Sequence, residues 1–134
     1  MFPVHSARVI VAAGLILFTV ACSEKKQQTG HRLVSPAEFA QVMAEPGTVT
    51  LNVLEANAPY IAGTDLKIRV DQLSARRADL PPTSTKLAVY CWSGHTSSLA
   101  VPVLEQLGYT NIAELEGGMQ AWSADGRKLV GGFS

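Results

Sequence analysis

Cysteine is scarce in this chain of 134 residues, where it occurs only at Cys22 and Cys91. An excess of charge of either sign is also missing, because Lys plus Arg and Asp plus Glu number 11 each. A basic surface for nucleic acid and an acidic tail are therefore not expected. His5 and His31 stand alone, without a second ligand at metal-binding spacing. We predict no nucleic-acid partner, no metal and no cofactor.

The chain also lacks a hydrophobic run long enough to span a bilayer as a helix, which needs about 20 residues. The longest run, Val9 to Val20, has 12 residues and fits the apolar core of a signal peptide. It leads into Thr19-Val20-Ala21-Cys22, which resembles a bacterial lipobox, although leucine is usual where Thr19 stands. We interpret residues 1–21 as a lipoprotein signal peptide and Cys22 as the lipidated residue. The alternative is an ordinary signal peptide followed by an incidental cysteine.

Cleavage before Cys22 leaves 113 residues, and residues 22–30 then form a polar, flexible tether between the lipid and a domain over 31–134. Ser23 follows the lipidated cysteine, and by resemblance to enterobacterial sorting this favours the outer membrane. We expect a cell-envelope protein on the periplasmic face of that membrane, held through the lipid at Cys22. Cys91 is then an unpaired thiol in an oxidising compartment.

The whole chain has 47% hydrophobic and 16% charged residues. This composition is typical of one globular domain. Ser35 is placed to cap a first helix, with Pro36 at its first position and Glu38 completing a capping box. Periodicity and turn residues predict strands over 48–54, 67–70, 86–90 and 111–115, and helices over 71–78, 99–107 and 119–124. Alternating strands and helices predict an α/β fold with a mostly parallel sheet covered on both faces.

The segment after strand 86–90 runs directly through Cys91 into a helix. In a parallel sheet this places the loop at the carboxyl end of the strands, where α/β folds bind ligands. Loop amides and the helix N-terminus form a cradle for negative charge there, which favours the thiolate form of Cys91. Gly94 allows the positive φ of a curled loop. Thr96, Ser97 and Ser98 can donate hydrogen bonds and cap the helix.

This loop resembles the active-site loop of rhodaneses, which has six residues in the pattern Cys-x-x-Gly-x-Arg or Cys-x-x-Gly-x-Thr. Cys91, Gly94 and Thr96 match it, and Leu115-Glu116-Gly117-Gly118 with Trp122 resembles the family's Leu-x-Gly-Gly-x-x-x-Trp segment. The resemblance covers about residues 33–130. It implies a three-layer α/β/α fold, Cys91 as the sulfur-carrying nucleophile, and a substrate and anion-binding loop comprising Trp92, Ser93, Gly94, His95, Thr96 and Ser97.

Four positions depart from the family pattern. Asn52 and Leu54 stand where an Asp and an Arg are common, Thr64 replaces a His, and Trp92 replaces an Arg that often follows the cysteine. Two of these changes remove cations that would help to bind an anionic donor such as thiosulfate. The resemblance therefore leaves the donor open.

These residues leave three functions to compare. A sulfurtransferase would move a sulfane sulfur from a small donor to a thiol or cyanide-like acceptor through a persulfide on Cys91. A catalytically weak module that binds a partner or senses sulfur species is the alternative, with any protein partner unknown. A phosphatase or arsenate reductase needs Cys-x5-Arg, whereas Ser97 stands at the sixth position and no arginine occurs between Arg77 and Arg127.

Overall fold

The computed structural model describes residue 14 and residues 30–131, so the predicted signal peptide (residue 14 apart) and Cys22 lie outside the described residues. The elements occur in this order: β1 (Gly30–Val34), α1 (Pro36–Ala44), β2 (Val49–Asn52), β3 (Leu66–Lys67), the 3-10 turns η1 (Val70–Gln72) and η2 (Arg77–Asp79), β4 (Leu87–Tyr90), α2 (His95–Gln106), β5 (Asn111–Leu115) and α3 (Gly118–Ala124). In residue 14 and residues 30–131, no helix is long and apolar enough to cross a membrane.

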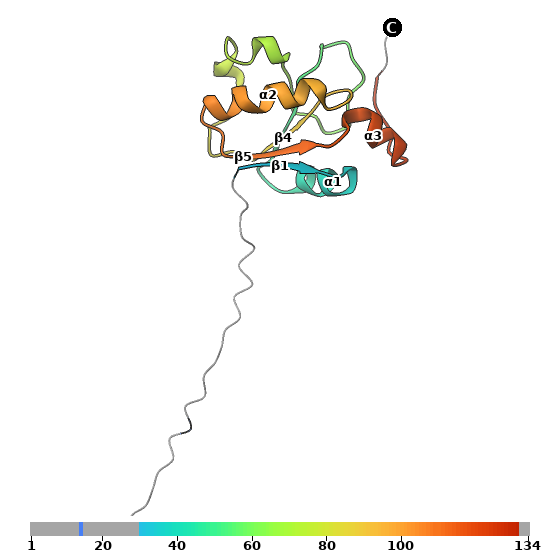
Figure 1. Cartoon of the computed structure of the whole chain (residues 1–134), viewed down its shortest axis with the longest axis horizontal. Helices are drawn as coiled ribbons and strands as arrows, with labels where there is room; N and C mark the ends of the chain where they lie inside the picture. The colour runs from blue at the N-terminus through green and yellow to red at the C-terminus, as the bar shows by residue number, and fades with distance from the viewer. Residues whose placement is uncertain (1–13, 15–29, 132–134) are drawn as a thin grey trace, which may run out of the picture.

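The named strands form one parallel sheet in the order β1-β5-β4-β2-β3, which confirms the predicted α/β fold. Helix α2 covers one face, and α1 with α3 lies on the other (Figure 1). Strand β4 lies in the middle and all four of its residues are buried. Because side chains alternate along a strand, Leu87 and Val89 join the core under α2, whereas Ala88 and Tyr90 join the core against α1 and α3.

Helix α1 begins as its sequence predicts. The Ser35 hydroxyl accepts a hydrogen bond from the Glu38 amide at 3.2 Å, and Pro36 occupies the first turn. The other half of the predicted capping box is replaced by an ion pair, because the Glu38 carboxylate binds Arg32 of β1 at 2.7 Å. Trp122 of α3 is 7% exposed and packs edge-on against Phe39 of α1.

Two predicted elements differ clearly from the structure, and the helix predicted over 99–107 begins four residues earlier, at His95. The predicted helix over 71–78 is two separate 3-10 turns, and Asp71 caps neither of them. Leu73 is the one buried side chain between Asp71 and Leu80, so this segment has no apolar stripe to hold a full helix against the sheet. The predicted strand over 67–70 is the two-residue β3, because the chain turns into η1 at Val70.

Strand β1 was not predicted at all. It begins at Gly30, the last residue of the predicted tether, and pairs in parallel with β5 at the edge of the sheet. Val34 is its one fully buried residue, so the strand carries no hydrophobic alternation that a sequence pattern could reveal. Its position matters for the site, because it places His31 beside β5.

Candidate active-site loop

Strand β4 ends at Tyr90, and Cys91 is the first residue after it. The chain curls through Gly94, whose φ of 96° lies in the left-handed region, and helix α2 begins at His95. This confirms the predicted strand-loop-helix geometry and the need for glycine at position 94. The sulfur therefore sits at the carboxyl end of the central strand, at the N-terminus of a helix of 12 residues.

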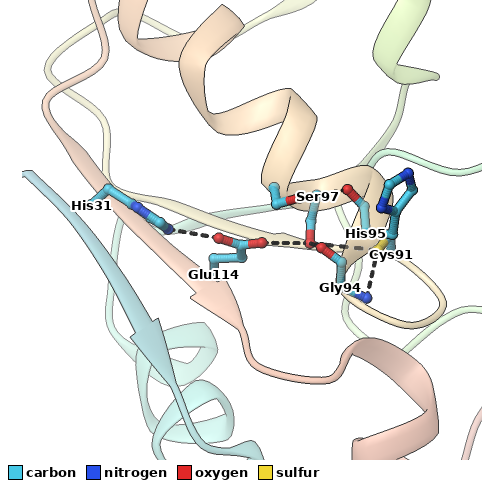
Figure 2. Close-up of polar contacts among 7 residues, drawn as sticks. His31, Cys91, Gly94, His95, Ser97 and Glu114 are labelled. Carbon is cyan, nitrogen blue, oxygen red and sulfur yellow. Dashed lines mark hydrogen bonds and ion pairs between the residues drawn. The ribbon is translucent and has the colours of Figure 1, made fainter.

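The Cys91 sulfur is held by hydrogen bonds on two sides. The Gly94 amide donates to Sγ at 3.0 Å, and the Ser97 hydroxyl oxygen lies 3.4 Å from Sγ (Figure 2). Cys91 is only 1% exposed, so a small reagent must reach the sulfur through the loop. An amide that points at the sulfur stabilises negative charge on it, as a hydrogen bond to a charged group does.

The loop is fixed from below by α3. The amides of Met119 and Gln120 donate to the carbonyl oxygens of Cys91 and Trp92 at 2.9 and 3.0 Å. A β-carbon on Gly118 would stand 2.6 Å from both of these oxygens, so only glycine permits the approach. The Gly117-Gly118 pair is thus the device that docks the N-terminus of α3 under the cysteine loop.

The other residues predicted for the loop divide into two groups. Ser97 is fully buried in α2, its oxygen lies 3.4 Å from the sulfur, and its own hydroxyl donates to Glu114 and not to the sulfur. Trp92 is 40% exposed, Ser93 and His95 are exposed, and Thr96 is half-buried. Helix α2 has Gly94 at its N-cap without a side-chain capping bond, so the predicted capping by Thr96, Ser97 or Ser98 is wrong. The Ser98 hydroxyl donates instead to the His95 carbonyl at 2.6 Å.

Sequence reasoning missed a chain of polar side chains behind the sulfur. Ser97 donates to Glu114 Oε1 at 2.7 Å, and Glu114 Oε2 lies 2.6 Å from His31 Nε2 (Figure 2). Glu114 is only 2% exposed on strand β5. Alternation along β5 could have revealed it, because Glu114 shares a sheet face with the buried Ile112. A carboxylate at such a position needs partners.

Two of the residues that depart from the family pattern, Thr64 and Asn52, form hydrogen bonds around the end of β4. The Ile61 amide donates to the Tyr90 hydroxyl at 2.9 Å, and the Thr64 hydroxyl lies 2.6 Å from Tyr90 and donates to the Ile61 carbonyl at 2.6 Å. Burial raises the pKa of the Tyr90 phenol, and these hydrogen bonds partly oppose the shift. Asn52 accepts from the Leu54 amide at 2.9 Å. These contacts anchor the end of β4, from which Cys91 projects.

Arg69 lies near the cysteine loop, a position that was not predicted from the sequence. A cavity of about 280 Å³ beside Thr96 is lined by Val53, Leu54, Glu55, Arg69, Val70, Asp71 and Thr96. Arg69 is bound to Asp71 through two hydrogen bonds of 3.1 and 2.9 Å, so its charge is largely balanced. Within the part of the chain that the structure describes, no group of three or more His, Cys, Asp or Glu side chains could hold a metal ion.

This arrangement agrees with the comparison with protein families, in which the rhodanese-like domain matches residues 35–125. The chain belongs to the rhodanese-like family. A rhodanese-related protein from Thermoplasma volcanium is 30% identical with a TM-score of 0.63, over 74% of this chain and 97% of that one. The rhodanese-like domain of an Anabaena sp. protein is 25% identical with a TM-score of 0.65, over 74% and 78%.

A third solved structure, from Rhodopseudomonas palustris, is described as a protein of unknown function and possible tyrosine phosphatase. It is 20% identical with a TM-score of 0.61, over 74% of this chain and 84% of that one, which shows a shared fold alone. The search of curated proteins finds no match. In this rhodanese-like chain Ser97 occupies the sixth position after Cys91 and faces the buried Glu114, so it supplies no guanidinium for a phosphate.

Proposed function

We propose that this rhodanese-like protein is a sulfurtransferase that carries a sulfane sulfur as a persulfide on Cys91. The observation that carries the proposal is the hydrogen bond of 3.0 Å from the Gly94 amide to Cys91 Sγ at the N-terminus of α2. A sulfur in that place receives an amide hydrogen bond that stabilises negative charge, which suits a nucleophile. The rest of the loop agrees, because the N-terminus of α3 fixes the carbonyl groups of Cys91 and Trp92.

The reaction has two displacements. In the first, the Cys91 thiolate attacks the outer sulfur of a small donor, a new S–S bond forms, and the donor leaves with the electron pair of its broken bond. In the second, a thiol or cyanide-like acceptor attacks the outer sulfur of the persulfide. The S–S electron pair then returns to Cys91 Sγ, where the Gly94 amide and the dipole of α2 stabilise the charge.

Intact-mass spectrometry of the domain before and after treatment with sulfur donors tests this proposal. Wild type should gain one sulfur, about 32 Da, and lose it again on addition of an acceptor, whereas Cys91→Ser should gain none. Equal labelling of wild type and Cys91→Ser would refute it. The donor panel should include thiosulfate, a polysulfide and a thiol persulfide, because these donors differ in charge.

A module that binds or senses sulfur species without turnover is the second candidate. It is favoured by the balanced charge of Arg69 and by Asn52 and Leu54, which leave the loop without a free cation among the residues that line its cavity. Persulfide formation without release to any acceptor would support this candidate.

We also propose, from the sequence of residues 1–22, that the protein acts in the cell envelope on a lipid anchor at Cys22.

A further inference from the structure

Glu114 is a buried acid that the reaction described above does not use. Its neighbours across the sheet, Leu33 on β1 and Val89 on β4, are uncharged. The groups that face it are His31 from β1, which is 32% exposed, and Ser97 from α2. Such a carboxylate is stable only because both partners bind it.

The other charged groups nearby are engaged or exposed. Arg32, the next residue on β1, turns to the opposite face of the sheet and pairs with Glu38. Arg69 and Asp71 pair with each other at the cavity that Thr96 lines. His95 and Glu116 are exposed, and the His95 ring lies outside the chain of hydrogen bonds in Figure 2.

Ser97 links this acid to the reactive sulfur but has only one proton to give. Its hydroxyl oxygen lies 2.7 Å from Glu114, 3.1 Å from the Gly94 carbonyl and 3.4 Å from Cys91 Sγ. When Glu114 is a carboxylate, Ser97 donates to it, and Cys91 can contribute only an S–H to the hydroxyl oxygen. When Glu114 is a carboxylic acid, it donates to Ser97, whose own proton is then free to point at the sulfur or at the Gly94 carbonyl.

We propose that Glu114 is a positioning residue that shares one proton with Cys91 across Ser97 and so decides whether Ser97 donates a hydrogen bond to the sulfur. The inference rests on the proposed role of Cys91 as the reactive sulfur. In the resting thiol form, Cys91 S–H donates to Ser97 and Ser97 donates to the Glu114 carboxylate. In the reactive form, Ser97 donates to the thiolate and the Glu114 carboxylic acid donates to Ser97.

The two forms interconvert with a balanced movement of protons. The Cys91 proton passes to the Ser97 oxygen, and the Ser97 proton passes to Glu114 Oε1, so no bond to carbon changes and nothing is oxidised or reduced. The same path serves the second displacement, in which the electron pair returning to Sγ meets a donor hydroxyl. His31 Nε2, 2.6 Å from the other carboxylate oxygen and partly exposed, exchanges the proton with solvent. A protonated His31 holds Glu114 as carboxylate, and therefore Cys91 as thiol.

Alkylation of Cys91 by iodoacetamide as a function of pH tests this device without any sulfur transfer. Gln at position 114 has no charge and can donate an N–H to Ser97 while its carbonyl oxygen faces His31, which allows the pattern in which Ser97 donates to sulfur. Glu114→Gln should therefore alkylate about tenfold faster than wild type below the half-maximal pH, and its profile should lie at lower pH. The matched control is Glu116→Gln, which removes an exposed carboxylate two residues along the chain and should follow wild type.

The double variant separates the hydroxyl from simple electrostatics. Ser97→Ala removes the hydroxyl, so Ser97→Ala/Glu114→Gln should react within about twofold of Ser97→Ala. An equal acceleration in both backgrounds would mean that the Glu114 charge acts through space, and an unchanged or slower Glu114→Gln would mean that the acid is only structural. Either result overturns the proposal.

Should Glu114→Gln fail to fold, His31→Gln decides the question. Gln at position 31 cannot take up a proton beside Glu114, so the carboxylic acid at Glu114 is favoured and alkylation should again be faster, by a smaller factor. A rate equal to or below that of wild type contradicts the proposal. The alkylation assay and the sulfur-transfer assay can fail independently. The alkylation rates can follow the expected pattern in a protein that accepts no sulfur from any donor. Sulfur transfer can also proceed in a protein whose alkylation rate does not respond to Glu114.

Discussion

Gly118 lies so close to Cys91 that a β-carbon added to Gly118 would stand 2.6 Å from the Cys91 carbonyl oxygen. Its φ of 59° is also one that other residues adopt at a cost. The Met119 amide at the N-terminus of α3 donates to the same oxygen at 2.9 Å. The close contact and the positive φ therefore both restrict the chain where α3 meets the cysteine loop. The shape of the cysteine loop therefore depends on a glycine that is far from it in sequence.

Gly118→Ala should lower the free energy of unfolding by about 2–4 kcal/mol, because backbone atoms must move to admit the methyl group. Urea unfolding measures this loss, and slower alkylation of Cys91 would report displacement of the loop. Gly126→Ala is the matched control, since Gly126 has a φ of 80° but nothing within 4 Å of the added carbon. It should lose only about 1 kcal/mol. Equal losses in the two variants would show that the contact with Cys91 is unimportant.

Tyr90 should contribute to stability through its hydroxyl, which accepts from the Ile61 amide. Tyr90→Phe leaves that amide without its acceptor and should cost about 1–3 kcal/mol at neutral pH, as measured by urea unfolding. Tyr60→Phe removes a hydroxyl from a half-buried ring beside Lys67 and should cost less than about 0.5 kcal/mol. Equal costs would refute the role of this hydrogen bond.

The raised pKa of Tyr90 also predicts that the protein loses stability at alkaline pH. Burial raises the pKa of Tyr90, so the folded chain holds this proton more tightly than the unfolded chain. The stabilisation is complete below about pH 10 and falls as the pH rises above that value. Tyr90→Phe should flatten this decline, leaving the part due to Tyr109, whose pKa burial also raises. An alkaline decline of wild-type steepness in Tyr90→Phe would contradict this assignment.

The fold could be predicted where sequence and structure use the same local signals. Ser35 and Pro36 mark the start of α1, and the buried run Leu87–Tyr90 leading to Gly94 marks the loop, because capping and glycine turns are local. The edge strand β1 escaped prediction because its pairing with β5, and not its own pattern, forms it. The turns η1 and η2 likewise depend on one buried anchor, Leu73.

The site could be predicted only in the segment around Cys91, for the same reason. Cys91, Gly94 and Ser97 are close in sequence, so a motif reveals them. Glu114 and His31 reach the sulfur only through the pairing of β5 with β4 and β1, across sequence separations of 17 and 83 residues along the hydrogen-bonded chain. No local pattern encodes such contacts.

The lipid anchor is testable on the full chain in cells. Because each buried CH₂ contributes about 0.8 kcal/mol, the several acyl chains of a lipoprotein should hold the protein in the membrane fraction. Cys22→Ser should abolish incorporation of labelled fatty acid and release the protein. Cys91→Ser, which removes the other cysteine, should remain lipidated and membrane-bound. A soluble wild type cleaved at the predicted site would refute the anchor.

Donor preference follows from the charges around the loop. Thiosulfate is a dianion, whereas the cysteine loop offers neutral donors and an exposed His95, and Arg69 at the cavity beside Thr96 is bound to Asp71. A hydrogen bond from an arginine to the anion would be charge-assisted and would raise kcat/KM about tenfold. We therefore predict poor transfer from thiosulfate and better transfer from thiol persulfides or polysulfides, and we expect Trp92→Arg to raise kcat/KM for thiosulfate about tenfold and for a persulfide much less.

Asp71→Asn tests whether Arg69 can serve the loop once its partner is removed. Exposed ion pairs are weak, so release of Arg69 should raise kcat/KM for thiosulfate only about two- to fivefold, and added salt should reduce the gain. Asp79→Asn is the matched control, because it frees Arg76 from an equally exposed pair that does not line the cavity beside Thr96. It should leave the ratio of the two donors unchanged. Equal gains in both variants would mean that net charge, and not the position of Arg69, determines how well thiosulfate is used. A wild type that already prefers thiosulfate strongly would contradict the predicted preference and would mean that a cation elsewhere in the fold serves the donor.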